Sequence, residues 1–216
     1  MIDVAAVVLM GGRASRLGGI VKGDLVVDGR TLLERAVAAG AAVAREVVVV
    51  GEPGRSRLPA GIRVVREEPP FGGPAAAVAA GVRALTGDAS AVLLLAGDLP
   101  FAADAVPALV EEFAAGEAAG AGGADPGGAA GGARAAGVRA VDDSGRAQHL
   151  LCVVRRDALD RAIEALAAHR PLDGASMRAL LAPLRFTDLA VPKAATMDVD
   201  TWADASAVGA TRGETS

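Results

Sequence analysis

Three short, entirely apolar runs constrain the fold of this 216-residue chain more than any other feature. They are Val4–Met10, Val47–Val50 and Ala91–Ala96, and each has the length of a strand that is buried on both faces. A helical pattern over about Thr31–Ala44 separates the first two, and Glu34 is placed to complete a capping box with Thr31. Because strand, helix and strand at this spacing form a parallel crossover, we predict an α/β domain built on a parallel sheet.

The composition excludes several classes of function. With a net charge of −4, 2% aromatic residues and no tyrosine, the chain lacks the basic surface and the stacking platforms of nucleic-acid-binding proteins. The acidic balance disfavours anionic membranes, and no apolar run is long enough to cross a bilayer. A lone Cys152 cannot form an internal disulfide, and Asp3 stands where a signal peptide would be basic, so we expect a cytoplasmic protein.

Glycines and cations follow the first apolar run. Gly11 and Gly12 end it, and Arg13, Arg16 and Lys22 come soon after. Glycines let backbone amides approach a ligand closely, rows of such amides bind anions, and cations neutralise the remaining charge. The pattern predicts a polyphosphate cradle, with an ordinary glycine turn and solvated arginines as the alternative. Neither the P-loop nor the dinucleotide fingerprint fits the spacing, which argues against a simple NTPase or dehydrogenase.

Two single residues strengthen the case for a phosphate site. Among the 22 basic residues only Lys22 and Lys193 are lysine, and a compact ammonium suits a phosphate contact. Asp98 follows the third apolar run, and open α/β sheets bind ligands at the carboxyl ends of their strands. Since Mg²⁺ binds through one or two carboxylates plus substrate phosphates, we predict Asp98 as its ligand; a helix cap is the alternative.

Together these blocks resemble the molybdenum-cofactor guanylyltransferases and related MobA-like nucleotidyltransferases. The stretch Leu9–Leu25 reads L-x-G-G-x-x-x-R-L-G-G-x-x-K-G-x-L, and Asp98-Leu99-Pro100 is similar to the family's D-x-P metal motif. The resemblance implies a three-layer Rossmann-like nucleotidyltransferase fold with a mostly parallel central sheet. It implies catalytic roles for Lys22, Arg16 and Asp98. The nucleotide-binding residues that it implies in these two blocks are Leu9, Met10, Gly11, Gly12, Arg13, Lys22 and Asp98.

Two further blocks carry the resemblance. Glu67, followed by G-P-x-x-x-x-x-x-G-V from Gly73, resembles the family's second block, which implies that Glu67, Gly73 and Pro74 bind the base and ribose; an ordinary βα loop is the alternative. The closing motif begins at Asp198. On a strand, Asp198 and Asp200 would project from one face, so we predict both as metal ligands beside Asp98. An N-cap role for Asp200 or Thr201 is the alternative.

The resemblance spans about residues 4–208, and we expect residues 1–208 to form one domain. The Gly/Ala-rich stretch 114–136 is expected to be a mobile insertion, and 209–216 a disordered tail. Val138–Val141 and Gln148–Val154 predict a hairpin. Val21, Trp202 and Met10 stand where relatives usually have Asp, Pro and Ala. Val21 removes an acidic group beside the triphosphate, which keeps a non-catalytic nucleotide-binding protein open as an alternative.

The reaction that the resemblance implies is Mg²⁺-dependent transfer of GMP from GTP to the terminal phosphate of molybdopterin, with release of pyrophosphate. Gly11-Gly12 favours the guanylyl branch, whereas Asp198-Val199-Asp200 leans towards the cytidylyl branch, so CTP is the alternative donor. A different phosphorylated acceptor also stays open. The expected partners are the nucleotide, a phosphorylated pterin, and a molybdoenzyme or cofactor-insertion protein.

Overall fold

The computed structural model describes residues 2–10, 21–121 and 134–212. Its centre is a seven-stranded sheet in the order β5-β4-β1-β6-β8-β7-β9. Neighbouring strands run parallel except where β8 pairs with β6 and with β7. The strands are β1 Val4–Met10, β4 Glu46–Gly51, β5 Arg63–Val65, β6 Ala91–Ala96, β7 Gly137–Val141, β8 Ala147–Arg155 and β9 Phe186–Ala190.

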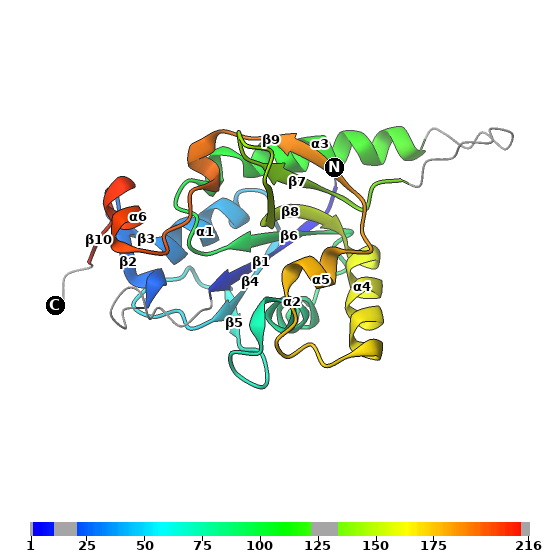
Figure 1. Cartoon of the computed structure of the whole chain (residues 1–216), viewed down its shortest axis with the longest axis horizontal. Helices are drawn as coiled ribbons and strands as arrows, with labels where there is room; N and C mark the ends of the chain where they lie inside the picture. Colours follow the sequence, from blue (N-terminus) through cyan, green and yellow to red (C-terminus); the bar gives the residue numbers. More distant parts are fainter. Residues whose placement is uncertain (1, 11–20, 122–133, 213–216) are drawn as a thin grey trace, which may run out of the picture.

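Helices cover both faces of this sheet (Figure 1). The α-helices are α1 Leu32–Ala41, α2 Gly73–Ala84, α3 Val106–Ala121, α4 Arg156–His169, α5 Met177–Leu181 and α6 Trp202–Ala207. Alternate residues of β1 pack in opposite directions: Val4 and Val8 belong to the core shared with α1 and α3, whereas Val7 and Leu9 belong to the core shared with α2, α4 and α5. The expected three-layer α/β fold with a mostly parallel sheet is therefore confirmed.

Local signals placed several elements correctly. Thr31 caps α1, and the predicted capping box with Glu34 is complete, because each residue's side chain accepts a hydrogen bond from the other's backbone N–H. Pro74 lies in the first turn of α2, where its missing N–H costs no hydrogen bond. The expected hairpin is the antiparallel pair β7 and β8.

A second, three-stranded sheet extends from one end of the molecule, and it corrects one expectation. It has the order β10-β2-β3, formed by Thr211–Arg212, Leu25–Val27 and Arg30–Thr31. Within the expected disordered tail, 209–216, Thr211 and Arg212 thus form a strand paired with β2. The Arg212 guanidinium also lies 4.7 Å from the centre of the Trp202 ring. Pairing and this cation–π contact together hold the segment in place.

The expected mobile insertion over 114–136 is also partly wrong. Residues 114–121 continue α3, because alanine has the highest helix propensity and dominates this run. Beyond the gap, Arg134 forms an ion pair with Glu117 at 2.7 Å, and Ala136 is buried. The middle of the stretch, 122–133, lies outside the described residues, as do 213–216. No helix in the described ranges is long and apolar enough to span a membrane.

Cys152 on β8 is a core residue, as expected, and this leads to a chemical prediction. Its side chain is fully buried among residues of the α2, α4 and α5 face, and burial raises the pKa of the thiol to about 12. We therefore expect no reaction of the native protein with Ellman's reagent at about pH 8, since the thiolate is the reactive form. Unfolding in guanidinium chloride should expose one reactive thiol, which the absorbance of the released thionitrobenzoate measures. A rapid reaction of the native protein would contradict the buried position.

Candidate nucleotide site

A cavity of about 380 Å³ opens where the parallel strands end. Leu9, Val50 and Ala96 line it from the last or next-to-last positions of β1, β4 and β6, which all run the same way. This is the edge at which open α/β sheets bind ligands, and the volume suits a small molecule. The remaining lining residues come from two loops, the start of α2 and β8: Glu67, Phe71, Gly73, Pro74, Ala77, Asp98 and Leu150.

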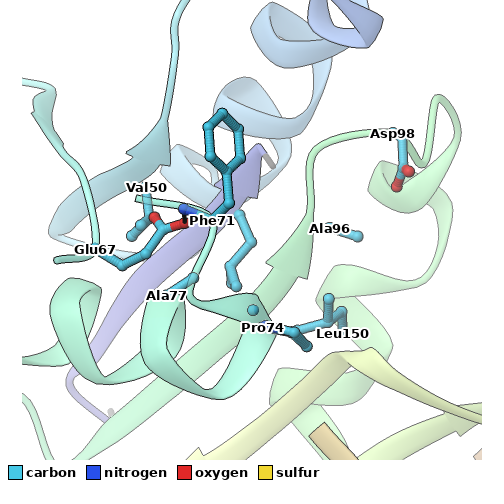
Figure 2. A pocket seen from close by; sticks show the side chains of 10 residues that line it. Val50, Glu67, Phe71, Pro74, Ala77, Ala96, Asp98 and Leu150 are labelled. Carbon is cyan, nitrogen blue, oxygen red and sulfur yellow. Dashed lines mark hydrogen bonds between the residues drawn. The ribbon is translucent and has the colours of Figure 1, made fainter. Parts of the chain in front are cut away.

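The cavity has an apolar lining and two carboxylates at its margins. Figure 2 shows Glu67 and Phe71 together on one side and Asp98 on the other. The Oε1 atom of Glu67 accepts a hydrogen bond of 3.0 Å from the Phe71 backbone N–H. Phe71 adopts a φ of 64° and keeps 56% of its surface exposed at the rim. The cavity therefore offers an apolar slot with one acidic group at each end.

The predicted residues of the second block meet at this cavity. Glu67, Gly73 and Pro74 all line it, as does Leu9 of the first block. Met10 does not: its side chain belongs to the core on the opposite face of the sheet, 6% exposed, as strand alternation requires. Only its backbone remains for a ligand. Gly11, Gly12, Arg13 and Arg16 lie outside the described residues.

Lys22 joins the first block to the third and the last. It begins the 3₁₀-helix η2, Lys22–Asp24, and its Nζ atom lies 3.4 Å from Oδ2 of Asp98. The same ammonium also donates a hydrogen bond to Oδ1 of Asp200. The Lys22 and Asp98 side chains are only 17% and 24% exposed, so the pair is shielded from water. The fold thus brings together three predicted site residues that are far apart in the sequence.

The shared charges shift the titration of this cluster. Burial by itself would lower the pKa of Lys22, but the hydrogen bond and charge of Asp200, together with the charge of Asp98, outweigh it and raise that pKa. Burial raises the pKa of Asp98, opposed by the Lys22 charge and reinforced by the charges of Asp198 and Asp200. Lys22 is therefore firmly cationic, and the carboxylates around it are crowded with like charge.

The C-terminal arm of the cluster differs from the expectation. Residues 197–200 follow the 3₁₀-helix η4, Lys193–Thr196, and belong to no strand, so the argument from alternation was wrong for Asp198 and Asp200. The segment is held instead by the Val199 N–H, which donates to the Asp98 carbonyl at 3.2 Å. Asp198 is exposed. Asp200 faces Lys22, and the N-cap alternative holds for Thr201.

One side chain fixes the backbone at Asp200. The Oδ2 atom of Asp204 accepts hydrogen bonds from the Asp200 N–H at 3.2 Å and the Thr201 N–H at 2.7 Å. It also accepts from the Thr201 hydroxyl at 2.8 Å, and Thr201 in turn caps α6 through the Asp204 N–H. The start of α6 therefore acts as an anchor that places Asp200 against Lys22.

The carboxylates of this cluster supply part of a Mg²⁺ coordination shell, and a ligand has to supply the rest. Two carboxylates, from Asp98 and Asp200, converge on one cation, the Lys22 ammonium, which marks a position where positive charge is favourable. Within the described ranges, no group of three His, Cys, Asp or Glu residues is arranged to hold a metal, so Asp98, Asp198 and Asp200 do not form a ready-made set. Two protein carboxylates completed by substrate phosphates fit Mg²⁺.

Arg35 is a residue that the sequence analysis missed. From α1 its Nε atom donates to the Pro100 carbonyl at 2.8 Å and its Nη1 atom to the Val27 carbonyl at 3.3 Å. Its guanidinium also lies 5.4 Å from the centre of the Phe101 ring. One planar side chain therefore ties β2, which follows Lys22, to the loop that carries Asp98. Only the fold brings these carbonyls together, so no local pattern could have identified it.

We expect Arg35→Met to lower the free energy of unfolding by about 2 kcal/mol, because it leaves two backbone carbonyls without their partner. Arg35→Lys should recover only part of the loss, since one ammonium cannot reproduce the two hydrogen bonds that the planar guanidinium donates in different directions. Urea unfolding measures both. The control is Arg45→Met, whose side chain is 80% exposed and pairs with Asp3 at the surface; it should change little. Equal losses at Arg35 and Arg45 would contradict the bridging role.

Comparison with known proteins gives results that agree with this geometry. A family profile described as the MobA-like NTP transferase domain matches residues 6–188. A molybdenum cofactor guanylyltransferase from Acidiphilium cryptum (strain JF-5) is 40% identical over 102 residues. That match covers 45% of this chain and 51% of the relative, so the two align over about half of each protein.

Solved structures share the whole fold at low sequence identity. Molybdopterin-guanine dinucleotide biosynthesis protein A from Archaeoglobus fulgidus has a TM-score of 0.63 at 18% identity, covering 94% of this chain and 96% of that one. The 2-C-methyl-D-erythritol 4-phosphate cytidylyltransferase from Francisella tularensis has a TM-score of 0.67 at 12% identity, covering 96% and 98%. At these identities the structural similarity shows a shared fold and nothing about the reaction. Since the family profile covers most of the chain, this protein belongs to the MobA-like NTP transferase family.

Proposed function

We propose that this protein transfers a nucleoside monophosphate, GMP from GTP, to the terminal phosphate of a pterin cofactor such as molybdopterin, with release of pyrophosphate. The observation that carries the proposal is the ion pair of Lys22 with Asp98, which itself lines the cavity of about 380 Å³. Membership of the MobA-like family supports the reaction class, and the guanylyltransferase relative supports the choice of GTP.

The residues fit the electrostatic problem of this reaction. The acceptor phosphate is already an anion, so no general base is needed; two anions have to meet, and negative charge grows on the departing pyrophosphate. We propose that Lys22, with Arg13, Arg16 and the amides of Gly11 and Gly12, binds and neutralises the triphosphate. Mg²⁺ held by Asp98 and Asp200 would supply further charge neutralisation there.

We propose that the base and ribose occupy the apolar part of the cavity. Leu9, Val50 and Ala77 would pack against the faces of the base, and Pro74 and Gly73 would border the sugar. The carboxylate of Glu67 lies at the end opposite Asp98 (Figure 2). Its Oε2 atom accepts no hydrogen bond from the described residues, so it is available to the N–H groups of guanine. Cytosine offers fewer such donors on one edge, which favours GTP.

The decisive experiment is product analysis. The full chain is incubated with Mg²⁺, molybdopterin and each nucleoside triphosphate in turn, and the products are identified by mass. The expected product is the pterin–guanine dinucleotide together with pyrophosphate. A cytosine product would assign the cytidylyl reaction. If Mg-GTP changes the fluorescence of Trp202, the sole tryptophan, but no acceptor yields product, the protein is a nucleotide-binding protein instead.

A further inference from the structure

We infer that Lys22 is a built-in competitor of the divalent cation, so that the protein binds its metal tightly only together with the nucleotide. The inference rests on the proposed function in one respect: it takes Asp98 and Asp200 as the metal's carboxylates. It concerns the order and coupling of binding, and it can be tested with neither turnover nor acceptor.

The first step is the position of the ammonium. Lys22 lies between Asp98 and Asp200 and is within ion-pair distance of both. Among the described residues these are its only ion-pair partners. The two carboxylates thus already share one cation, and it is covalently attached to the protein, so its local concentration is high and constant.

The second step is that the backbone around the two carboxylates is held in place, so that they stay on either side of the Lys22 side chain. The Asp204 carboxylate accepts one hydrogen bond from the Asp200 N–H and two from Thr201, and the Asp98 carbonyl accepts one from the Val199 N–H. Lys22 itself belongs to η2, which leads directly into β2 of the small sheet. The Lys22 side chain is 17% exposed, so water screens it weakly.

The third step concerns a metal ion that arrives alone. It has to displace the ammonium from both carboxylates or bind beside a fixed positive charge, and either course weakens its binding. A nucleotide removes this obstacle. Lysine is a point charge on a flexible four-carbon stem, so its ammonium can turn to the phosphates while the carboxylates turn to the metal. Metal and nucleotide should therefore strengthen each other's binding reciprocally.

The test measures Mn²⁺ binding to the full chain without nucleotide, using the electron paramagnetic resonance signal of free Mn²⁺. We expect Lys22→Met to bind Mn²⁺ at least about tenfold more tightly than the unmodified protein. Lys22→Gln, which keeps a polar group on a shorter stem, should show the same gain. The matched control is Lys193→Met, the chain's other lysine, which is 74% exposed and lies 3.9 Å from Asp143; its affinity should not change.

A double variant locates the gain. Adding Asp98→Asn to Lys22→Met should abolish the extra affinity, because a carboxylate of the site is lost. The inference is overturned if neither Lys22 variant gains affinity, or if the gain survives Asp98→Asn. Its failure is distinct from failure of the proposed function. If the Lys22 variants bind Mn²⁺ more tightly but the unmodified protein transfers no nucleotide, the competition by Lys22 stands and the proposed reaction is rejected. If the unmodified protein forms product but the Lys22 variants bind Mn²⁺ no more tightly, the reaction stands and the competition is rejected.

Discussion

Asp98→Ala is expected to lower nucleotidyl transfer by at least about 100-fold while the protein remains folded. Asp98 is the described carboxylate that both lines the cavity and contacts Lys22. Its removal takes away the group that we propose to hold the metal opposite the triphosphate, and the remaining residues cannot neutralise the charge of the departing pyrophosphate. The measurement is pyrophosphate release with GTP, molybdopterin and saturating Mg²⁺.

Stability should not suffer from the isosteric change Asp98→Asn. The pKa of Asp98 in the folded protein lies above that in the unfolded chain, mainly because of burial. Its contribution to stability is therefore present at low pH and is lost as the pH rises through the folded pKa, because ionising the buried carboxyl costs stability. Thermal unfolding at about pH 7 should show a melting temperature for Asp98→Asn no lower than that of the unmodified protein.

The matched control for activity is Asp160→Asn on α4. Asp160 also pairs with a basic residue, Arg156, at 2.9 Å, but it does not line the cavity. The turnover of Asp160→Asn should stay within about twofold of that of the unmodified protein, because a partly exposed ion pair contributes little to stability. Near-normal turnover of Asp98→Ala at saturating Mg²⁺ would remove Asp98 from the mechanism.

Gly51→Ala is expected to produce the largest loss of stability, about 3 kcal/mol or more. Gly51 ends β4 opposite Met10 and has a φ of 124°, a conformation that residues with a side chain avoid. A Cβ atom there would overlap the carbonyl oxygen of Met10, which is backbone and cannot rotate away. The strands β1 and β4 would have to separate at the edge that forms the cavity. Urea unfolding measures the loss.

Gly61→Ala separates the cost of the positive φ from the cost of the overlap with the Met10 carbonyl. Gly61 also has a positive φ, 90°, but a Cβ atom there would meet nothing within 4 Å. This control carries the conformational cost alone, about 1 kcal/mol. If Gly51→Ala costs no more than Gly61→Ala, the close approach of β4 to the Met10 carbonyl is not what requires glycine.

The sequence by itself determined the frame of this protein. Local patterns indicate which faces must be buried and where helices begin. Such patterns here are the apolar runs of β1, β4 and β6, the capping box at Thr31 and the position of Pro74. Asp98 could be singled out for the same reason, since it follows a buried strand directly. The resemblance to the MobA-like family rested on four such blocks, and the family profile bears it out.

Only the tertiary structure decided how the blocks meet. Lys22 and Asp200 are 178 positions apart and yet share a hydrogen bond, and no spacing rule predicts such a pair. The same holds for Arg35, whose partners Val27 and Pro100 become neighbours through packing of α1. Alternation failed for Asp198 because residues 197–200 belong to no strand and are tied to the Asp98 loop by the Val199 N–H. Short-range preferences set the elements, whereas the burial of their apolar faces against one another sets which charges lie together.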